Sequence, residues 1–222
     1  SPRELSMRTL PCFFLLVFSF VPFAAADYSV QVLTDAPPAD ELSDEIAAQL
    51  NPTGFTVKRS ETSTLCNIWF CKNWQVAPDF KSTEEVLYPF QPGQLIGVIE
   101  YKRRGEDFRE QDINRGVYTL RYAQQPIDGN HEGTSPTRDF LLVVAAEQDQ
   151  SADVMDIRKL YTASAEAAES SHPGLLLMQA VPADEDISAP SIRSTDDEWE
   201  IVRLAGSAAA GDAAKPLAMD LV

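Results

Sequence analysis

The sequence predicts a mainly β protein, a single antiparallel β-sandwich domain with one or two helical decorations. Short runs rich in β-branched and aromatic residues recur along the chain, separated by turns that contain Gly, Pro, Asn and Asp. Two further segments have helical periodicity, and they do not alternate regularly with the expected strands. A doubly wound α/β sheet requires such alternation and is therefore the second choice.

We expect residues 1–26 to be a leader, in which 1–6 lie upstream of the first methionine. Met7-Arg8-Thr9 is a short basic segment, and residues 13–23 form an almost unbroken apolar run. Three alanines then supply the small side chains that signal peptidases read, so we expect cleavage before Asp27. The apolar run is about half as long as a membrane-spanning helix. We expect a periplasmic or secreted protein, with no membrane insertion after signal cleavage.

Residues 27–205 are expected to form the β-sandwich domain. Residues 140–146 are apolar on both faces, which predicts a strand in the middle of a sheet that is covered on both sides. Residues 73–93 contain three prolines and predict an irregular excursion. The expected strands are 28–33, 55–59, 65–71, 95–101, 116–122, 139–146, 175–181 and 199–204.

Helical stripes predict helices at residues 40–50 and 152–169. Ser151 can cap the second helix. Its inner face is expected to carry Val154, Ile157, Leu160, Tyr161 and Ser164. Residues 206–222 are expected to be a small-residue linker and C-terminal tail: a flexible stretch over 206–214, then a short strand over 216–222.

The chain carries 34 acidic and 18 basic residues, a formal net charge of −16. Such a charge repels nucleic acid and anionic lipid, so we expect no nucleic-acid partner. It fits a solvated extracytoplasmic protein, or one that meets cations. An unidentified partner of the cell envelope or the extracellular space is expected.

Two cysteines, Cys66 and Cys71, remain after cleavage. In one strand, residues five apart point to opposite faces and lie about 16 Å apart. A disulfide needs Cα atoms within about 7 Å. We therefore expect free thiols, with Cys66 in the core. The alternative is a strand that ends before Cys71, which would allow a disulfide.

The segment 128–139 fits a twelve-residue calcium loop in part. Oxygen-bearing side chains occupy the first, third, fifth and twelfth places, and glycine occupies the sixth, where the sharp turn is needed. These residues are Asp128, Asn130, Glu132, Asp139 and Gly133. The flanks are strands instead of helices, and the same residue types occur in ordinary long hairpin loops. Calcium at this loop and a metal-free hairpin are both kept as hypotheses.

His131 lies in the same loop, and His172 is the second of the two histidines in the chain. Together with Asp128, Glu132 or Asp139 they could form a zinc or copper site. The sequence does not bring the two histidines together, and His172 precedes a proline where a helix is expected to end. A cap at the helix C-terminus is the alternative role.

No catalytic motif is present. The G-x-S-x-G, H-E-x-x-H, C-x-x-C and P-loop patterns are all absent. Trp69, Trp74 and Trp199 could line a carbohydrate-binding face, or they could pack in the core.

Six blocks of the sequence carry a resemblance: 116–122, 125–126, 128–131 and 135–142, with 66–69 and 171–174. Together they resemble a family of uncharacterised exported bacterial proteins with no established activity. The resemblance implies export and a single domain, and it implies no catalytic residues. It also points to the hairpin over 116–142 as the functional surface.

We therefore expect an exported, non-enzymatic binding or scaffold domain of the cell envelope. One alternative is a metal-dependent (calcium or zinc) enzyme or binding site built on Asp128, His131, Glu132 and Asp139. The other alternative is a carbohydrate-binding module.

Overall fold

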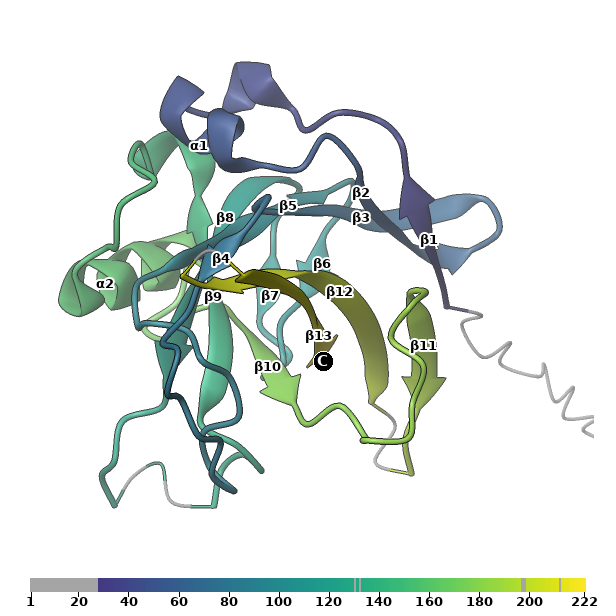
Figure 1. Cartoon of the computed structure of the whole chain (residues 1–222). Helices are drawn as coiled ribbons and strands as arrows, with labels where there is room; N and C mark the ends of the chain where they lie inside the picture. The colour runs from purple at the N-terminus through teal and green to yellow at the C-terminus, as the bar shows by residue number, and fades with distance from the viewer. Residues whose placement is uncertain (1–27, 130, 132, 197–198, 212) are drawn as a thin grey trace, which may run out of the picture.

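The computed structural model describes residues 28–129, 131, 133–196, 199–211 and 213–222, so the predicted leader lies outside the described residues. Within them, eleven strands form one sheet in the order β1-β2-β3-β5-β8-β9-β10-β13-β12-β11, with β4 beside β12. Figure 1 shows that this sheet curls round on itself. The fold is mainly β, of the β-sandwich or half-barrel class, with two helices, and the predicted fold class is confirmed.

The strands of this sheet are antiparallel to their neighbours, except that β4 runs parallel to β12. The bounds are β1 Ser29–Leu33, β2 Gly54–Ser60, β3 Ser63–Phe70, β4 Trp74–Gln75, β5 Leu95–Tyr101, β8 Gly116–Gln124, β9 Asp139–Ala145, β10 Leu175–Gln179, β11 Ser191–Ser194, β12 Glu200–Ala210 and β13 Ala213–Leu221. A separate short pair consists of β6 Gly105–Glu106 and β7 Asp112–Ile113.

The inside of the curl is a packed apolar core. Strands near both edges of the sheet contribute side chains to this core. The two layers of the sandwich are therefore two parts of one continuous sheet. A chain of edge-to-face rings crosses it, with centroid distances of 5.1 Å for Phe70–Trp74, 5.3 Å for Trp74–Phe90 and 5.5 Å for Phe90–Tyr122. The irregular excursion predicted over 73–93 is observed beyond β4, and it delivers Phe90 to this core.

A second, smaller core lies on the outer face of the sheet, between β9 and α2 (Ile157–Ala167). Strand β9 is apolar on both faces: Leu141 and Val143 belong to the inner core, and Leu142 and Val144 to the outer one. The prediction that this strand is covered on both sides is confirmed. Figure 1 shows α2 outside the curl.

The helix predicted over 152–169 begins later and ends earlier. Its N-cap is Asp156 and not Ser151. The Asp156 side chain accepts hydrogen bonds from the amides of Arg158 and Lys159. The preceding residues are held elsewhere, because the carbonyls of Ser151 and Asp153 accept from Arg121 of β8 and the amide of Met155 donates to the carbonyl of Gly93. A buried arginine thus prevents an earlier start. Leu160 and Ser164 do lie on the buried face, whereas Val154 is 47% exposed.

The first predicted helix, 40–50, is also shorter than expected. A single 3₁₀ turn over Ala39–Glu41 precedes α1 (Asp44–Gln49). Ser43 caps α1, and its hydroxyl accepts from the amide of Ile46 at 3.3 Å. Ile46 is fully buried and closes one end of the core.

The prediction of a flexible linker over 206–214 is wrong. Strand β12 continues through this stretch to Ala210 and pairs with β13 over nine residue positions. The small residues serve close packing: a Cβ added to Gly206 would lie 2.2 Å from the indole of Trp74. Gly211, at the turn, has a φ of +69°, which favours glycine.

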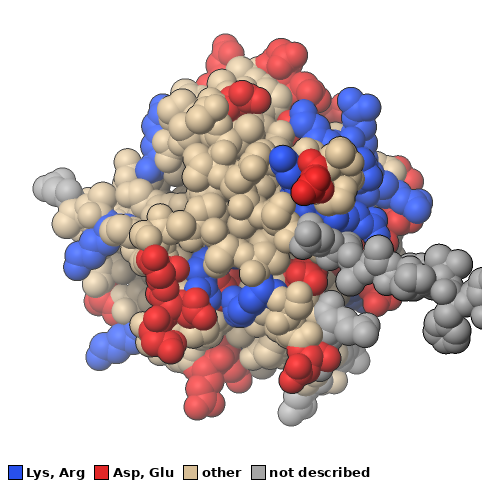
Figure 2. All heavy atoms as spheres, turned by 90° about the vertical axis from the view of Figure 1, so that its right-hand side faces the viewer, with Lys and Arg blue, Asp and Glu red and all other residues tan. Residues whose placement is uncertain are grey.

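The edge strands β1 and β11 approach each other on the right of Figure 1. Figure 2 views this side and shows charged side chains around the margins of a mainly uncharged surface. Val32 of β1 is 57% exposed. In the described part of the chain, neither helix has the length and apolar character needed to span a membrane.

Candidate functional site

Of the predicted metal residues in the loop between β8 and β9, the structure describes Asp128, His131 and Asp139. Nδ1 of His131 lies 2.6 Å from Oδ1 of Asp128, so these two side chains are brought together. Asn130 and Glu132 lie outside the described residues. The Asp139 carboxylate is hydrogen-bonded within the fold, to Leu87 and Tyr122.

Asp139 is fully buried at the start of β9. Its carboxylate accepts a hydrogen bond from the hydroxyl of Tyr122 and another from the amide of Leu87, at 2.6 Å. Burial raises the pKa of the Asp139 carboxyl, and the hydrogen bonds from Tyr122 and Leu87 act in the opposite direction. This carboxylate therefore fastens the excursion after β4 to the sheet, which disfavours it as the twelfth calcium ligand. Among the described residues no group of three or more His, Cys, Asp or Glu could hold a metal ion, and the calcium loop stays a prediction.

The three tryptophans do not form an exposed strip. Trp69 and Trp74 are buried, and their indole nitrogens donate to the carbonyls of Asp35 at 2.9 Å and Ile96 at 2.8 Å. Trp199 is half-buried and packs edge-on against a phenylalanine ring. Of the two roles considered for the tryptophans, Trp69 and Trp74 have the role in core packing, and the carbohydrate-binding module stays a prediction.

The two cysteines are free and buried, as expected. Cys66 lies in β3. Cys71 directly follows the end of β3, and its backbone forms an isolated antiparallel β-bridge with Leu50. Burial raises the pKa of both thiols to about 12. Neither thiol is therefore suited to act as a nucleophile.

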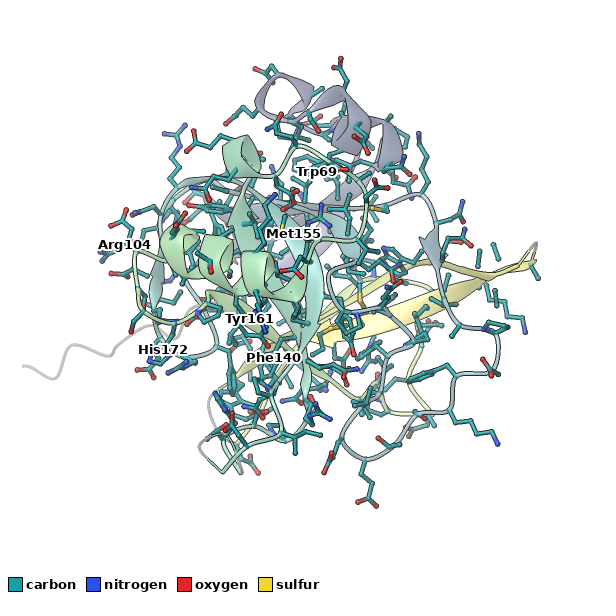
Figure 3. All side chains as sticks on the ribbon, turned by 90° about the vertical axis from the view of Figure 1, so that its left-hand side faces the viewer. Trp69, Arg104, Phe140, Met155, Tyr161 and His172 are labelled. Atoms are coloured by element: carbon teal, nitrogen blue, oxygen red, sulfur yellow. The ribbon has the colours of Figure 1, made fainter. Side chains whose placement is uncertain are left out.

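A pocket of about 700 Å³ lies on the outer face of the sheet beside α2. Its floor is apolar, with Ala123 of β8, Phe140 and Leu142 of β9 and Leu175 of β10. Tyr161 of α2 forms one wall. Figure 3 places Tyr161, Phe140 and His172 on one side of the molecule, at the edge of α2. The floor belongs to the outer core and is thus fixed by packing on both faces of the sheet.

The opposite wall comes from the segment between β6 and β7, which carries Phe108 and Arg109. Buried Asp107 organises it. Its carboxylate accepts from the amides of Arg109 at 2.8 Å, Gln111 at 2.9 Å and Leu175 at 3.1 Å. The wall is therefore tied to β10 and held in a defined position.

Polar and basic groups line the mouth of this pocket. Arg109, His131 and His172 come from three separate segments, so the fold brings both histidines of the chain to one pocket. The hairpin loop adds Gln125 and Ser135, and the Tyr161 hydroxyl ties α2 to the hairpin by donating to a backbone carbonyl at 2.8 Å.

A second hollow of about 480 Å³ lies against the same hairpin loop. It shares Gln125, Pro126, His131 and Ser135 with the first pocket. Arg138 fastens the base of the loop by donating twice to the carbonyl of Gln125, at 2.9 and 2.8 Å. The hairpin singled out by the sequence therefore borders both hollows.

No family model, curated protein or solved structure matches this chain. The site therefore stands on its own geometry. The sequence pointed to His131 and the hairpin, but not to Phe108, Arg109 or the residues of the pocket floor. The apolar outer face of 140–146 was the available signal, because it showed that something must cover that face.

Proposed function

We propose that this protein is an exported binding domain of the cell envelope, and that its ligand is a small, largely apolar molecule held in the pocket beside α2. The observation that carries the proposal is a preformed apolar floor under a polar mouth. Phe140 and Leu142 supply the floor, and Arg109, His131 and His172 supply the mouth.

The size of the pocket supports a small ligand. Small-molecule sites occupy about 300–1,000 Å³, are lined mainly by apolar side chains and carry a few polar groups that set orientation. The pocket of about 700 Å³ lies within this range. Its walls are held by hydrogen bonds that Asp107 accepts and that Tyr161 donates, so little ordering is needed on binding.

Binding is favoured over catalysis by the state of the described nucleophiles. The cysteine thiols are buried with raised pKa values. The Ser135 hydroxyl at the pocket donates to the carbonyl of Thr137. A serine nucleophile would instead need a general base within hydrogen-bond reach.

The test is saturable binding of N-phenyl-1-naphthylamine, an uncharged apolar dye that fluoresces when removed from water. We expect one dye per protein and strong loss of affinity in Ala123→Phe, because the added ring projects from the pocket floor. Ala48→Phe, at an exposed position of α1, is the matched control and keeps the affinity. No saturable binding, or equal loss in both variants, would contradict the proposal. Thermal unfolding of each variant establishes that it is folded.

A further inference from the structure

Two groups at the pocket mouth have no partner within the described part of the chain. The guanidinium of Arg109 makes no hydrogen bond or ion pair there, and neither does the imidazole of His172. Other basic side chains nearby are engaged: Arg138 with Gln125, and His131 with Asp128. In a chain with 34 acidic and 18 basic residues, an unpaired arginine beside an apolar pocket leaves a cation available for a ligand.

The backbone that carries Arg109 is preorganised. Its amide donates to Asp107, whose carboxylate also accepts from the amide and side chain of Gln111 and from the amide of Leu175. The Gln111 side chain reaches further, to the carbonyl of Pro173, next to His172. The two segments that bear Arg109 and His172 are thus linked to each other.

We propose that the ligand of this pocket is an alkyl carboxylic acid, whose chain lies on the apolar floor and whose carboxylate binds Arg109, with a further hydrogen bond from His172. This rests on the proposed function and names its ligand class. A guanidinium presents paired N–H groups that match the two oxygens of a carboxylate. The floor of Ala123, Phe140 and Leu142 is apolar. An alkyl chain that lies on it is removed from water, which favours binding.

Calorimetry on the purified protein tests the head group with three probes of one chain length: decanoate, 1-decanol and decyltrimethylammonium. Hydrogen bonds to charged groups are stronger than neutral ones, and the gain corresponds to about 10- to 100-fold in affinity. We expect decanoate to bind at least about 10-fold more tightly than decanol, and the ammonium to bind most weakly. Equal affinities for the acid and the alcohol would overturn the inference.

Arg109→Gln separates the head group from the chain. It should remove the advantage of decanoate and leave the affinity for decanol unchanged. Arg104→Gln is the control, because Arg104, which Figure 3 labels, lies in the turn before β6 and is paired with Asp112 at 3.1 Å. His172→Gln should weaken decanoate binding by a smaller factor.

The two proposals fail in different ways. If the uncharged dye binds the pocket but Arg109→Gln leaves decanoate unaffected, the ligand class is wrong and the binding function stands. If decanoate and the dye both fail to bind, both proposals are wrong. Loss of decanol binding in Arg109→Gln would also overturn the inference, since it would show a structural role for Arg109.

Discussion

Replacing Arg121 with methionine should destabilise the protein strongly, because it leaves a buried carboxylate without its counter-ion. Nε of Arg121 lies 2.6 Å from Oδ2 of Asp149, Nη2 lies 2.9 Å from Oδ1, and both side chains are almost fully buried. The same guanidinium donates to the carbonyls of Gly93 and Asp153, both at 2.8 Å. Removing one partner of such a pair costs about 3–5 kcal/mol. That is a large part of the stability of an ordinary domain, about 5–15 kcal/mol.

Urea unfolding measures this loss, and thermal unfolding should show a decrease of about 6–20 °C in Tm. Arg104→Met is the matched control: its ion pair with Asp112 is exposed, and such pairs contribute about 0–1 kcal/mol. Combining Arg121→Met with Asp149→Leu should recover much of the loss, because no unpaired charge remains. Equal losses in Arg121→Met and Arg104→Met would refute the reasoning.

Three further results are expected. Gly206→Ala should lower the free energy of unfolding in urea by about 1–3 kcal/mol, because the added Cβ would overlap the indole ring of Trp74. Gly129→Ala is the control and should change the stability little, because nothing lies within 4 Å of the added Cβ. Equal losses of stability in the two variants would argue against the overlap. Burial raises the pKa of Cys66 and Cys71 from 9.0 to about 12, so their contribution to stability is present below pH 9 and is lost as the pH rises toward 12. Urea unfolding across this pH window should show a smaller decline for Cys66→Ala, and an identical decline would count against buried neutral thiols. Calcium added after EDTA should not raise Tm by several degrees, because the Asp139 carboxylate is already bonded within the fold; such a rise would restore the calcium loop.

The sequence predicted local strand structure well where side-chain type and alternation determine it. Residues 95–101 were expected as a strand, and β5 has these bounds. Strand β9 was expected to be covered on both faces, and it is. The strand order could not be predicted, because register depends on contacts between residues far apart in the chain.

Errors arose where distant side chains override local signals. Ser151 satisfies the rule for a helix cap, but its carbonyl is bound by Arg121. Residues 206–214 have the composition of a linker, yet their small size admits the ring of Trp74 against the strand. Neither partner can be identified from the segment itself.

The candidate site was predicted only in part. The hairpin with His131 was identified from its polar residues, and His172 was considered without any reason to place it nearby. The fold joins them to Arg109, a residue that no pattern in the sequence singled out. Sites built from several segments depend on topology, so their composition cannot be inferred from spacing.

NMR spectra of the methyl-labelled protein, titrated with decanoate, test the central claim most directly. We expect the methyl signals of Ala123, Leu142 and Leu175 on the pocket floor to shift in a saturable way. Leu204 and Ala218, which are buried in β12 and β13, should not shift. Shifts at Leu204 and Ala218 without shifts at the pocket floor, or no shifts at all, would contradict the account.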